Sequence, residues 1–224
     1  MSIKTIERKV LQKNDEVAHQ NRSFFDKQGI FALNLVSSPG SGKTSLLEWT
    51  LKELEERVKT AVVIGDVQTS LDAERLSSFD LPIIQLVTNG SCHLEASLVK
   101  DALADIHAEA TELLFIENVG NLVCPSSFDL GEAMKVVISS TVEGDDKPLK
   151  YPAMFRNSGG LIINKTDLLP YTNCDLDQLR ANALKINPDL TIFETSCISG
   201  EGIGEWCNWL EKQVREKEWK NVSA

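Results

Sequence analysis

The chain has 224 residues, a length that suits one α/β domain with a short appendage. Its formal net charge of −10 and pI near 4.9 give no broad phosphate-attracting surface, so nucleic acid is not an expected partner. No apolar run approaches the roughly 20 residues of a membrane span, and the polar segment 1–29 lacks the apolar core of a signal peptide. The five cysteines are too few and too irregular for a disulfide framework. We therefore expect a cytoplasmic protein with no membrane partner, whose thiols are free or bind metal.

Expected strands and helices alternate along most of the chain. Residues 1–28 carry apolar side chains at spacings of three, four and seven, which predicts a helical appendage lying against a domain formed by 29–224. Strands are expected at 31–36, 61–64, 83–87, 113–116, 134–138, 161–163 and 190–193. Helices are expected at 43–57, 72–78, 93–109, 175–185 and 203–217. This alternation predicts an α/β fold, a mostly parallel sheet with helices on both faces that binds ligands at the carboxyl ends of its strands.

A glycine-rich loop with the sequence SSPGSGKT follows the first expected strand, at Ser37–Thr44. The backbone N–H groups of such a loop surround phosphate oxygens, and the following helix N-terminus adds positive potential. Lys43 is placed to reach the β- and γ-phosphates, and the Thr44 hydroxyl suits Mg²⁺. Ser37 departs from the glycine of the usual pattern, but a generic turn does not account for Gly-Lys-Thr after a buried strand. Nucleotide contacts are expected from Pro39, Gly40, Ser41, Gly42, Lys43, Thr44 and Ser45.

The base is selected by a second motif, NKTD at Asn164–Asp167, directly after the strand expected at 161–163. The Asp167 carboxylate can accept hydrogen bonds from guanine N1–H and from its exocyclic amine, a donor pair that adenine lacks. Lys165 can lie along the base plane, while Asn164 braces the loop. Ser196 and Cys197 follow the last expected strand, where such proteins present backbone to the guanine oxygen. The expected nucleotide is therefore GTP or GDP.

Acidic side chains stand at the ends of two further strands. Glu117 ends an apolar strand and is placed to hold Mg²⁺, directly or through water, while the Gly120 N–H can bond the γ-phosphate. Asp66 is a second candidate for the metal or the attacking water, and Asp72 is a third; the alternatives are a turn residue and a helix N-cap. No obvious catalytic glutamine follows Gly120, which predicts slow intrinsic hydrolysis. The expected catalytic residues are Lys43, Asp66 and Glu117, and the expected magnesium ligands are Thr44, Asp66 and Glu117.

A different set of ligands is found at Cys92, His93 and Cys124. A thiolate and an imidazole suit Zn²⁺, Ni²⁺ or copper rather than Mg²⁺. Both segments follow strand ends, so they can meet. The alternative for any single cysteine is a small buried hydrophobe, which we expect for Cys174, Cys197 and Cys207. It explains Cys92 less well, because a histidine follows it directly in a Gly/Ser turn. If the site exists, Cys124 lies in the segment that senses the γ-phosphate, so metal affinity and nucleotide state are coupled.

These motifs together resemble the HypB family of hydrogenase nickel-incorporation GTPases, which are SIMIBI-class P-loop proteins. The resemblance covers essentially the whole chain and includes, besides the P-loop, the segments 65–69, 72–75, 90–94, 117–125 and 143–152. It implies a GTPase that dimerises with GTP and helps insert nickel into [NiFe]-hydrogenase. The implied partners are a nickel-delivery chaperone and the hydrogenase large subunit. The family's metal ligands correspond to Cys92, His93 and Cys124 at the dimer face, where Zn²⁺ can also bind.

One departure and one open assignment accompany the resemblance. Many family members carry an N-terminal Cys-x-x-Cys motif or a histidine-rich tract, whereas the first cysteine here is Cys92. High-affinity nickel binding by the N-terminus and nickel storage are therefore not expected. Lys147 and Lys150 lie in the segment associated with the dimer contact. Whether either reaches a phosphate across the interface is a hypothesis, and an unchanged hydrolysis rate in Lys150→Ala counts against Lys150.

Three other functions are consistent with parts of the sequence. The urease accessory GTPases share the fold class but carry Cys-Pro-His, whereas Cys92 and His93 are adjacent. A metal storage or sensing protein with a vestigial nucleotide site conflicts with the complete guanine motif. A P-loop small-molecule kinase is opposed by Asn164–Asp167.

Overall fold

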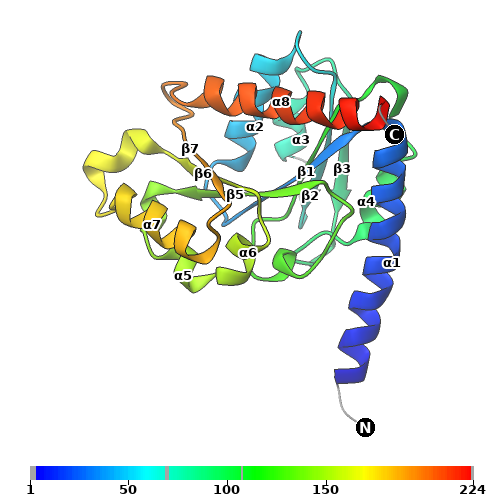
Figure 1. Ribbon diagram of the computed structural model, residues 1–224, viewed down its shortest axis with the longest axis horizontal. Coiled ribbons are helices and arrows are strands. Elements are labelled where there is room, and N and C mark those ends of the chain that lie inside the picture. The colour runs from blue at the N-terminus through cyan, green and yellow to red at the C-terminus, as the bar shows by residue number, and fades with distance from the viewer. Residues whose placement is uncertain (1–3, 69–70, 107, 223–224) are drawn as a thin grey trace.

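The computed structural model describes residues 4–68, 71–106 and 108–222, and seven strands within them form one sheet in the order β3-β2-β4-β1-β5-β6-β7 (Figure 1). Every neighbouring pair is parallel. The strands are β1 Phe31–Ser37, β2 Thr60–Asp66, β3 Ile83–Val87, β4 Leu113–Glu117, β5 Met134–Ser140, β6 Gly160–Asn164 and β7 Thr191–Glu194. The central strand β1 is buried along its whole length, as expected for a parallel sheet covered on both faces. The predicted α/β fold is confirmed.

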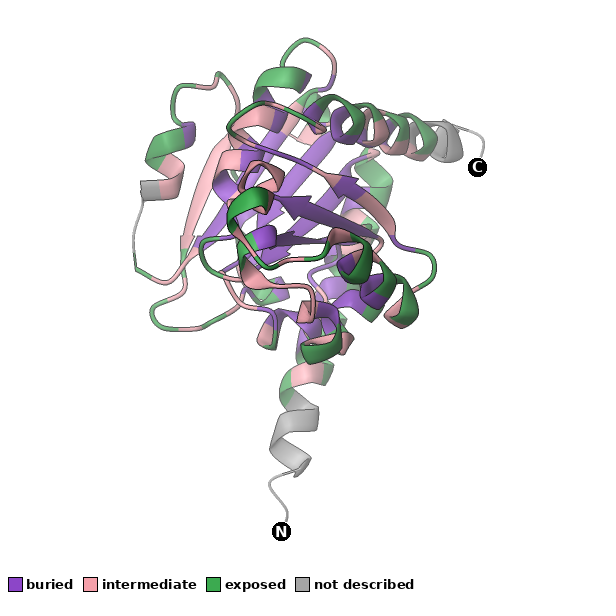
Figure 2. Ribbon diagram, turned by 90° about the vertical axis from the view of Figure 1, so that its left-hand side faces the viewer, coloured by how far each residue is buried: buried purple, intermediate pink, exposed green. Residues whose placement is uncertain are grey.

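Helices cover both faces of the sheet (Figure 2). One face packs against α2, α3 and α8 around a core that includes Leu46, Leu76 and Trp206. The other packs against α1 and α4 through Phe25 and Val99, and against α6 and α7 through separate clusters. The helices are α1 Lys4–Gln28, α2 Lys43–Leu54, α3 Leu71–Leu76, α4 Ala96–Ala102, α5 Lys147–Lys150, α6 Pro152–Arg156, α7 Leu176–Ile186 and α8 Ile203–Val222. Short 3₁₀ turns are η1 Ala108–Ala110, η2 Cys124–Ser126, η3 Thr141–Glu143 and η4 Thr166–Tyr171.

The helix expected over 93–109 is wrong at both ends, because α4 covers only Ala96–Ala102. The backbone is extended at Glu95, and the Leu94 N–H donates to the Asn118 side chain rather than to a helical carbonyl. The Ala96 N–H is then capped by Asn14 Oδ1 of α1, at 2.9 Å. The contacts that start the helix therefore come from distant segments, and a periodic pattern of apolar residues contains no information about them.

Helix α1 packs closely against the domain through buried and partly exposed polar contacts. Asn21 donates to the carbonyls of Ala96 at 2.9 Å and Leu130 at 3.0 Å, and Arg22 pairs with Asp129 at 2.8 Å. Gly131 has a φ of +90°, and a Cβ there would lie 2.6 Å from the Ala18 carbonyl oxygen, so glycine permits this approach. The boundary at residue 28 between an appendage and the main domain stays a prediction. In the part of the chain that is described, no helix has the length and apolar character needed to cross a bilayer.

Candidate nucleotide and metal site

The carboxyl ends of β1, β2 and β4 open onto a cavity of about 550 Å³. Residues 37–45 form one wall, and Asp66, Asp72, Gly120 and Lys165 contribute to the others. The structure therefore brings the predicted phosphate loop together with both predicted acidic segments at one edge of the sheet. Arg75 also lines the cavity, where it pairs with Glu48 at 2.7 Å; sequence reasoning did not single it out as a site residue.

The phosphate loop adopts the conformation that its glycines allow. Gly40 and Gly42 have φ values of +77° and +93°, and a Cβ on Gly42 would lie 2.4 Å from Asn164 Nδ2. Gly42 precedes α2 and gives that helix no side-chain cap, so its first N–H groups are not satisfied by a capping side chain. A helix N-terminus of this kind provides hydrogen bonds and positive potential for a phosphate.

A buried carboxylate faces the first turn of α2. Glu117 is 1% exposed; its Oε1 lies 3.1 Å from Lys43 Nζ and 2.8 Å from the Thr44 hydroxyl, which also lies 3.1 Å from Asp72 Oδ1. The second oxygen, Glu117 Oε2, is buried and has no hydrogen-bond partner among the described residues. Asp66 lines the same cavity and accepts from the Val67 N–H at 2.5 Å. A buried oxygen without a partner, next to a threonine hydroxyl, fits the hard oxygen ligands of Mg²⁺.

The loop after β4 closes against the phosphate loop at Gly120. A Cβ at this position would lie 3.2 Å from the backbone of Pro39, so a larger residue would push the two loops apart. Gly120 therefore brings the segment that leads to Cys124 into contact with the predicted phosphate loop.

The base-binding segment is linked to the phosphate loop by direct hydrogen bonds. Asn164 donates to the Ser41 carbonyl at 2.9 Å and accepts from Thr195 at 3.2 Å. Lys165 adopts a positive φ of +62°, and its ammonium donates to the Gly40 carbonyl at 2.6 Å. These contacts fix the positions of the two motifs relative to each other.

The predicted guanine-binding carboxylate is also held in place. Ser196 donates to Asp167 Oδ1 at 2.6 Å, and Trp49 of α2 donates to the Cys197 carbonyl at 2.8 Å. One Asp167 oxygen is thus oriented by the segment that follows β7. Burial raises the pKa of the Cys197 thiol, more than its contact with Asn164 lowers it, so this side chain stays protonated.

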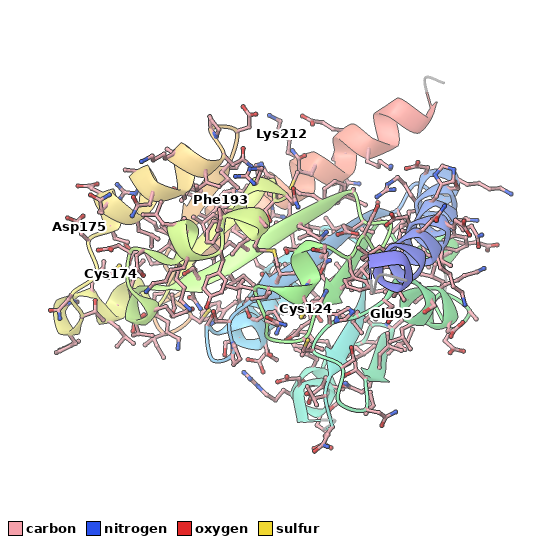
Figure 3. All side chains as sticks on the ribbon, turned by 90° about the horizontal axis from the view of Figure 1, so that it is seen from below. Glu95, Cys124, Cys174, Asp175, Phe193 and Lys212 are labelled. Carbon is pink, nitrogen blue, oxygen red and sulfur yellow. The ribbon has the colours of Figure 1, made fainter. Side chains whose placement is uncertain are left out.

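The thiol and imidazole groups expected to bind metal come together in space. The ligand atoms of Cys92, His93 and Cys124 all lie within 4.8 Å of one another. The two Sγ atoms are 3.0 Å apart, and Cys92 Sγ is 3.9 Å from His93 Nδ1. Cys92 and His93 lie between β3 and α4, whereas Cys124 begins η2; Figure 3 places Cys124 well away from Cys174. The geometry suits one soft or borderline cation held by two sulfurs and one nitrogen.

Metal binding at this cluster is coupled to proton release from its thiols. Burial lowers the pKa of His93 more than the neighbouring Glu95 raises it, so the imidazole is neutral at neutral pH. The Nε2 atom of His93 is buried without a hydrogen-bond partner in the described part of the chain, and the ring packs against Phe128 with centroids 3.9 Å apart. The contact with Cys124, followed by burial, raises the pKa of the Cys92 thiol. A bound metal would therefore displace thiol protons and use an imidazole that is already neutral.

A third group beside the phosphate loop was missed by sequence reasoning. Glu143 accepts from the Ser41 hydroxyl at 2.8 Å and pairs with Lys147 at 3.1 Å, and Lys147 also donates to the Ser38 hydroxyl at 3.2 Å. The signal was available, because Ser140 and Glu143 form a capping box at the start of η3. Lys150 is exposed and pairs instead with Asp146, at 2.5 Å.

Comparison with known proteins gives one consistent answer. Residues 31–194 match the family model described as the nucleotide-binding domain of CobW/HypB/UreG. The hydrogenase maturation factor HypB of Azotobacter vinelandii is 51% identical over 208 residues, covering 93% of this chain and 69% of that protein.

Two solved structures agree with the sequence comparison. The crystal structure of HypB from Helicobacter pylori in complex with nickel has a TM-score of 0.86 at 41% identity, covering 92% of this chain and 97% of that one. HypB from Archaeoglobus fulgidus has a TM-score of 0.85 at 36% identity, with 91% and 99% covered. The chain therefore belongs to the HypB family of hydrogenase maturation factors.

Proposed function

We propose that the chain is a GTPase that handles nickel as cargo for [NiFe]-hydrogenase maturation and couples nucleotide state to metal binding. One observation carries this proposal: the segment that runs from Glu117, the last residue of β4, to Cys124 contacts Lys43 and Thr44 at its start and lies 3.0 Å from Cys92 at its end. A single segment of eight residues therefore contacts both the phosphate pocket and the thiol cluster.

Nucleotide binding uses residues already in place. The backbone N–H groups of residues 40–45 and the Lys43 ammonium bind the phosphates, while Asp167 accepts from the guanine edge. A magnesium ion, when bound to Thr44, Glu117 and Asp66, supplies charge neutralisation of the β- and γ-phosphates. With the Glu117 carboxylate on the metal, Lys43 would be free to pair with the γ-phosphate instead. The closeness of Gly120 to Pro39 supports a role for the Gly120 N–H at the γ-phosphate.

In this proposal, nickel is the cargo of the site formed by Cys92, His93 and Cys124. Two thiolates and one imidazole bind Ni²⁺ and Zn²⁺ without strong discrimination, so Zn²⁺ is expected to compete. The unpartnered Nε2 atom of His93 supports its availability as a ligand. The relative from Helicobacter pylori, crystallised in complex with nickel, supports this choice of cargo.

GTP-dependent dimerisation is part of the same proposal. Three exposed apolar side chains belong to segments beside the nucleotide and thiol sites: Val123, Val142 and Leu149. Exposed apolar side chains at a functional edge favour burial by a partner surface. Lys150 is exposed next to them, whereas Lys147 is held within its own subunit by Glu143, so Lys150 is better placed to reach across a dimer. We propose further that a nickel-delivery chaperone and the hydrogenase large subunit receive or supply the metal in the cytoplasm.

The test is nickel and zinc binding by titration calorimetry, with GDP and then with a non-hydrolysable GTP analogue. Wild type is compared with Cys92→Ala and with Cys174→Ala, which removes a thiol outside the cluster. We expect Cys92→Ala to weaken metal binding at least about 100-fold, as for loss of a ligand, and Cys174→Ala to match wild type. Wild-type affinity or stoichiometry should differ between nucleotides. If metal binding is the same in Cys92→Ala as in wild type and the same with both nucleotides, while GTP is hydrolysed, the proposal of nickel delivery is wrong. The chain is then a regulatory GTPase.

A further inference from the structure

Asn118 joins the phosphate-sensing loop to the segment that carries two metal ligands. It follows Glu117 directly and is 1% exposed. Its Oδ1 atom accepts two backbone N–H groups, Val119 at 2.9 Å and Leu94 at 3.1 Å. Leu94 follows His93, while Val119 precedes Gly120. The buried Asn118 oxygen therefore connects Leu94, next to the proposed metal ligand His93, with Val119, next to the proposed γ-phosphate contact Gly120.

The orientation of the Asn118 amide is fixed from behind. Its Nδ2 donates to Asn34 Oδ1 at 3.2 Å, and Asn34 donates in turn to Glu132 Oε1 at 3.1 Å. Glu132 is paired with Lys135 at 3.2 Å. Each member of this chain is buried, and buried polar networks whose members are all satisfied hold a single arrangement. The Asn118 oxygen is consequently unable to turn away from Leu94 without breaking several other contacts.

A second asparagine holds the same segment from the other side. Asn121 Nδ2 donates to the Cys92 carbonyl at 3.2 Å, and its Oδ1 accepts from the Val123 N–H at 2.9 Å. The loop that carries Cys124 thus bonds the backbone at two places, the carbonyl of Cys92 and the N–H of Leu94. Cys92 and His93 have no independent position relative to Cys124.

We infer that Asn118 is a positioning residue that locks the Cys92–His93 segment to the loop after β4, with Asn121 as a second contact. Movement of that loop at the γ-phosphate then carries both halves of the thiol cluster together. Nucleotide state changes where the cluster lies relative to a second subunit, which is how it alters metal affinity, and leaves the separation of the ligands within one subunit unchanged. The inference rests on the proposed function for its biological use, because nickel is the cargo that the cluster is proposed to hold.

The separation of the two thiols can be measured without metal. Metal-free protein is equilibrated with reduced and oxidised glutathione, and the Cys92–Cys124 disulfide is quantified by peptide mapping. In this exchange the two cysteine thiols are oxidised to one disulfide, and one glutathione disulfide is reduced to two glutathione thiols. The equilibrium constant is the effective concentration of one thiol at the other. It falls when the two loops separate.

The variants distinguish positioning from general destabilisation. Asn118→Ala removes the shared acceptor, whereas Asn118→Asp keeps an acceptor oxygen for Leu94 and Val119. Asn121→Ala changes a half-buried side chain, so it provides a second test if Asn118→Ala fails to fold. Asn187→Ala is the matched control, since Asn187 also bridges segments, donating to the carbonyls of Phe155 and Ser158, away from the cluster.

We expect Asn118→Ala to lower the effective concentration about tenfold, the change that one net hydrogen bond corresponds to, with a smaller fall in Asn121→Ala. Asn118→Asp should stay near wild type, and Asn187→Ala should equal it. Wild type should give the same value with GDP and with the GTP analogue, while Asn118→Ala becomes sensitive to the nucleotide. Values in Asn118→Ala equal to wild type, or an equally large fall in Asn118→Asp, overturn the inference. Failure of nickel binding in wild type overturns the proposed function and leaves this thiol measurement valid.

Discussion

The half of the strand-end edge proposed to bind the base and the half proposed to bind the phosphates and metal are built differently. In the base-binding half, Asn164, Lys165 and Asp167 each have a hydrogen-bond partner at 2.6–2.9 Å from the phosphate loop or from the segment after β7. In the other half, Glu117 holds Lys43 and Thr44 with one oxygen and leaves its second oxygen buried and unpartnered in the described structure.

This difference separates recognition from switching. A preformed site binds its ligand without the cost of ordering side chains, so under the proposed function guanine is recognised in both nucleotide states. The phosphate half contains contacts that a nucleotide must replace, since Lys43 and Thr44 are bonded to a protein carboxylate. Only a half whose contacts differ between states can bias a conformational change.

The largest expected effect comes from removing the guanine-reading charge. Asp167→Asn replaces a carboxylate, which has two acceptor oxygens, by an amide, which has one, and leaves a guanine donor unpaired. The affinities for GTP and GDP should therefore both fall at least about 100-fold. Fluorescent-nucleotide titration measures this. Asp177→Asn is the control, because Asp177 is exposed on α7 and pairs only with Arg180 among the described residues. Equal GTP affinity in Asp167→Asn and wild type would show that the base lies elsewhere.

The next effect should fall on hydrolysis rather than on binding. Glu117→Gln removes the charge that faces Lys43 and Thr44, and we expect kcat for GTP to fall about 100-fold, as for loss of a preorganised electrostatic contact. The Kd for GDP should change by less than about fivefold, because Lys43 is then unpaired and available to phosphate. Single-turnover phosphate release and nucleotide titration separate the two quantities. A large loss of GDP affinity with unchanged kcat would reverse the assignment of the two halves.

A smaller effect tests how far the base-binding half is preformed. Trp49→Phe keeps an aromatic ring in α2 but removes the N–H that donates to the Cys197 carbonyl. We expect a roughly three- to tenfold rise in the Kd for GTP, the size of one net hydrogen bond, and no change in kcat. Trp209→Phe is the control, because Trp209 stacks on Trp206 away from this loop. Equal affinities in the two variants would mean that the loop is held by its own turn.

Sequence reasoning reached the fold and the motif residues because both are written in local patterns. Buried runs of Val, Ile and Leu predict the strands, and ligands follow strand ends in a parallel sheet. Asn164, Lys165 and Asp167 stand directly after β6, and the structure places them beside the phosphate loop. Cys92, His93 and Cys124 were expected to meet for the same reason, and their ligand atoms do lie together.

The parts that were not predicted depend on partners far apart in the chain. Helix α4 begins late because Asn118 and Asn14, from other segments, take the N–H groups of Leu94 and Ala96. Glu143 contacts Ser41 across 102 positions of sequence. The spacing of residues along the chain contains no information about such contacts. The motif residues of each half were therefore predicted, whereas the residues that connect the two halves were missed.

The smallest expected effect concerns Glu143, which supports the phosphate loop from behind. Burial alone would raise the pKa of this carboxyl, but hydrogen bonds from Ser38, Ser41 and Lys147 together with the Lys147 charge lower it below its ordinary value of 4.5. A lowered folded-state pKa contributes stability above the unfolded value, and this contribution is lost as the pH falls below about 4.5. Glu143→Gln should therefore reduce the free energy of unfolding by about 1 kcal/mol at pH 7.

The difference between Glu143→Gln and wild type should shrink as the pH is lowered from 4.5 toward the folded-state pKa, since the carboxyl of the unfolded chain takes up its proton before that of the folded chain does. Urea unfolding at pH 7 and near pH 4 measures both values, with Glu53→Gln as a control in a half-exposed pair with Arg57. A difference that stays constant with pH would mean that shape, not charge, holds Ser41. In the expected case the charge of Glu143 stabilises the phosphate loop before any nucleotide arrives. The loop then belongs with the preformed base-binding half, and switching is confined to the carboxylates on the other side of the phosphates.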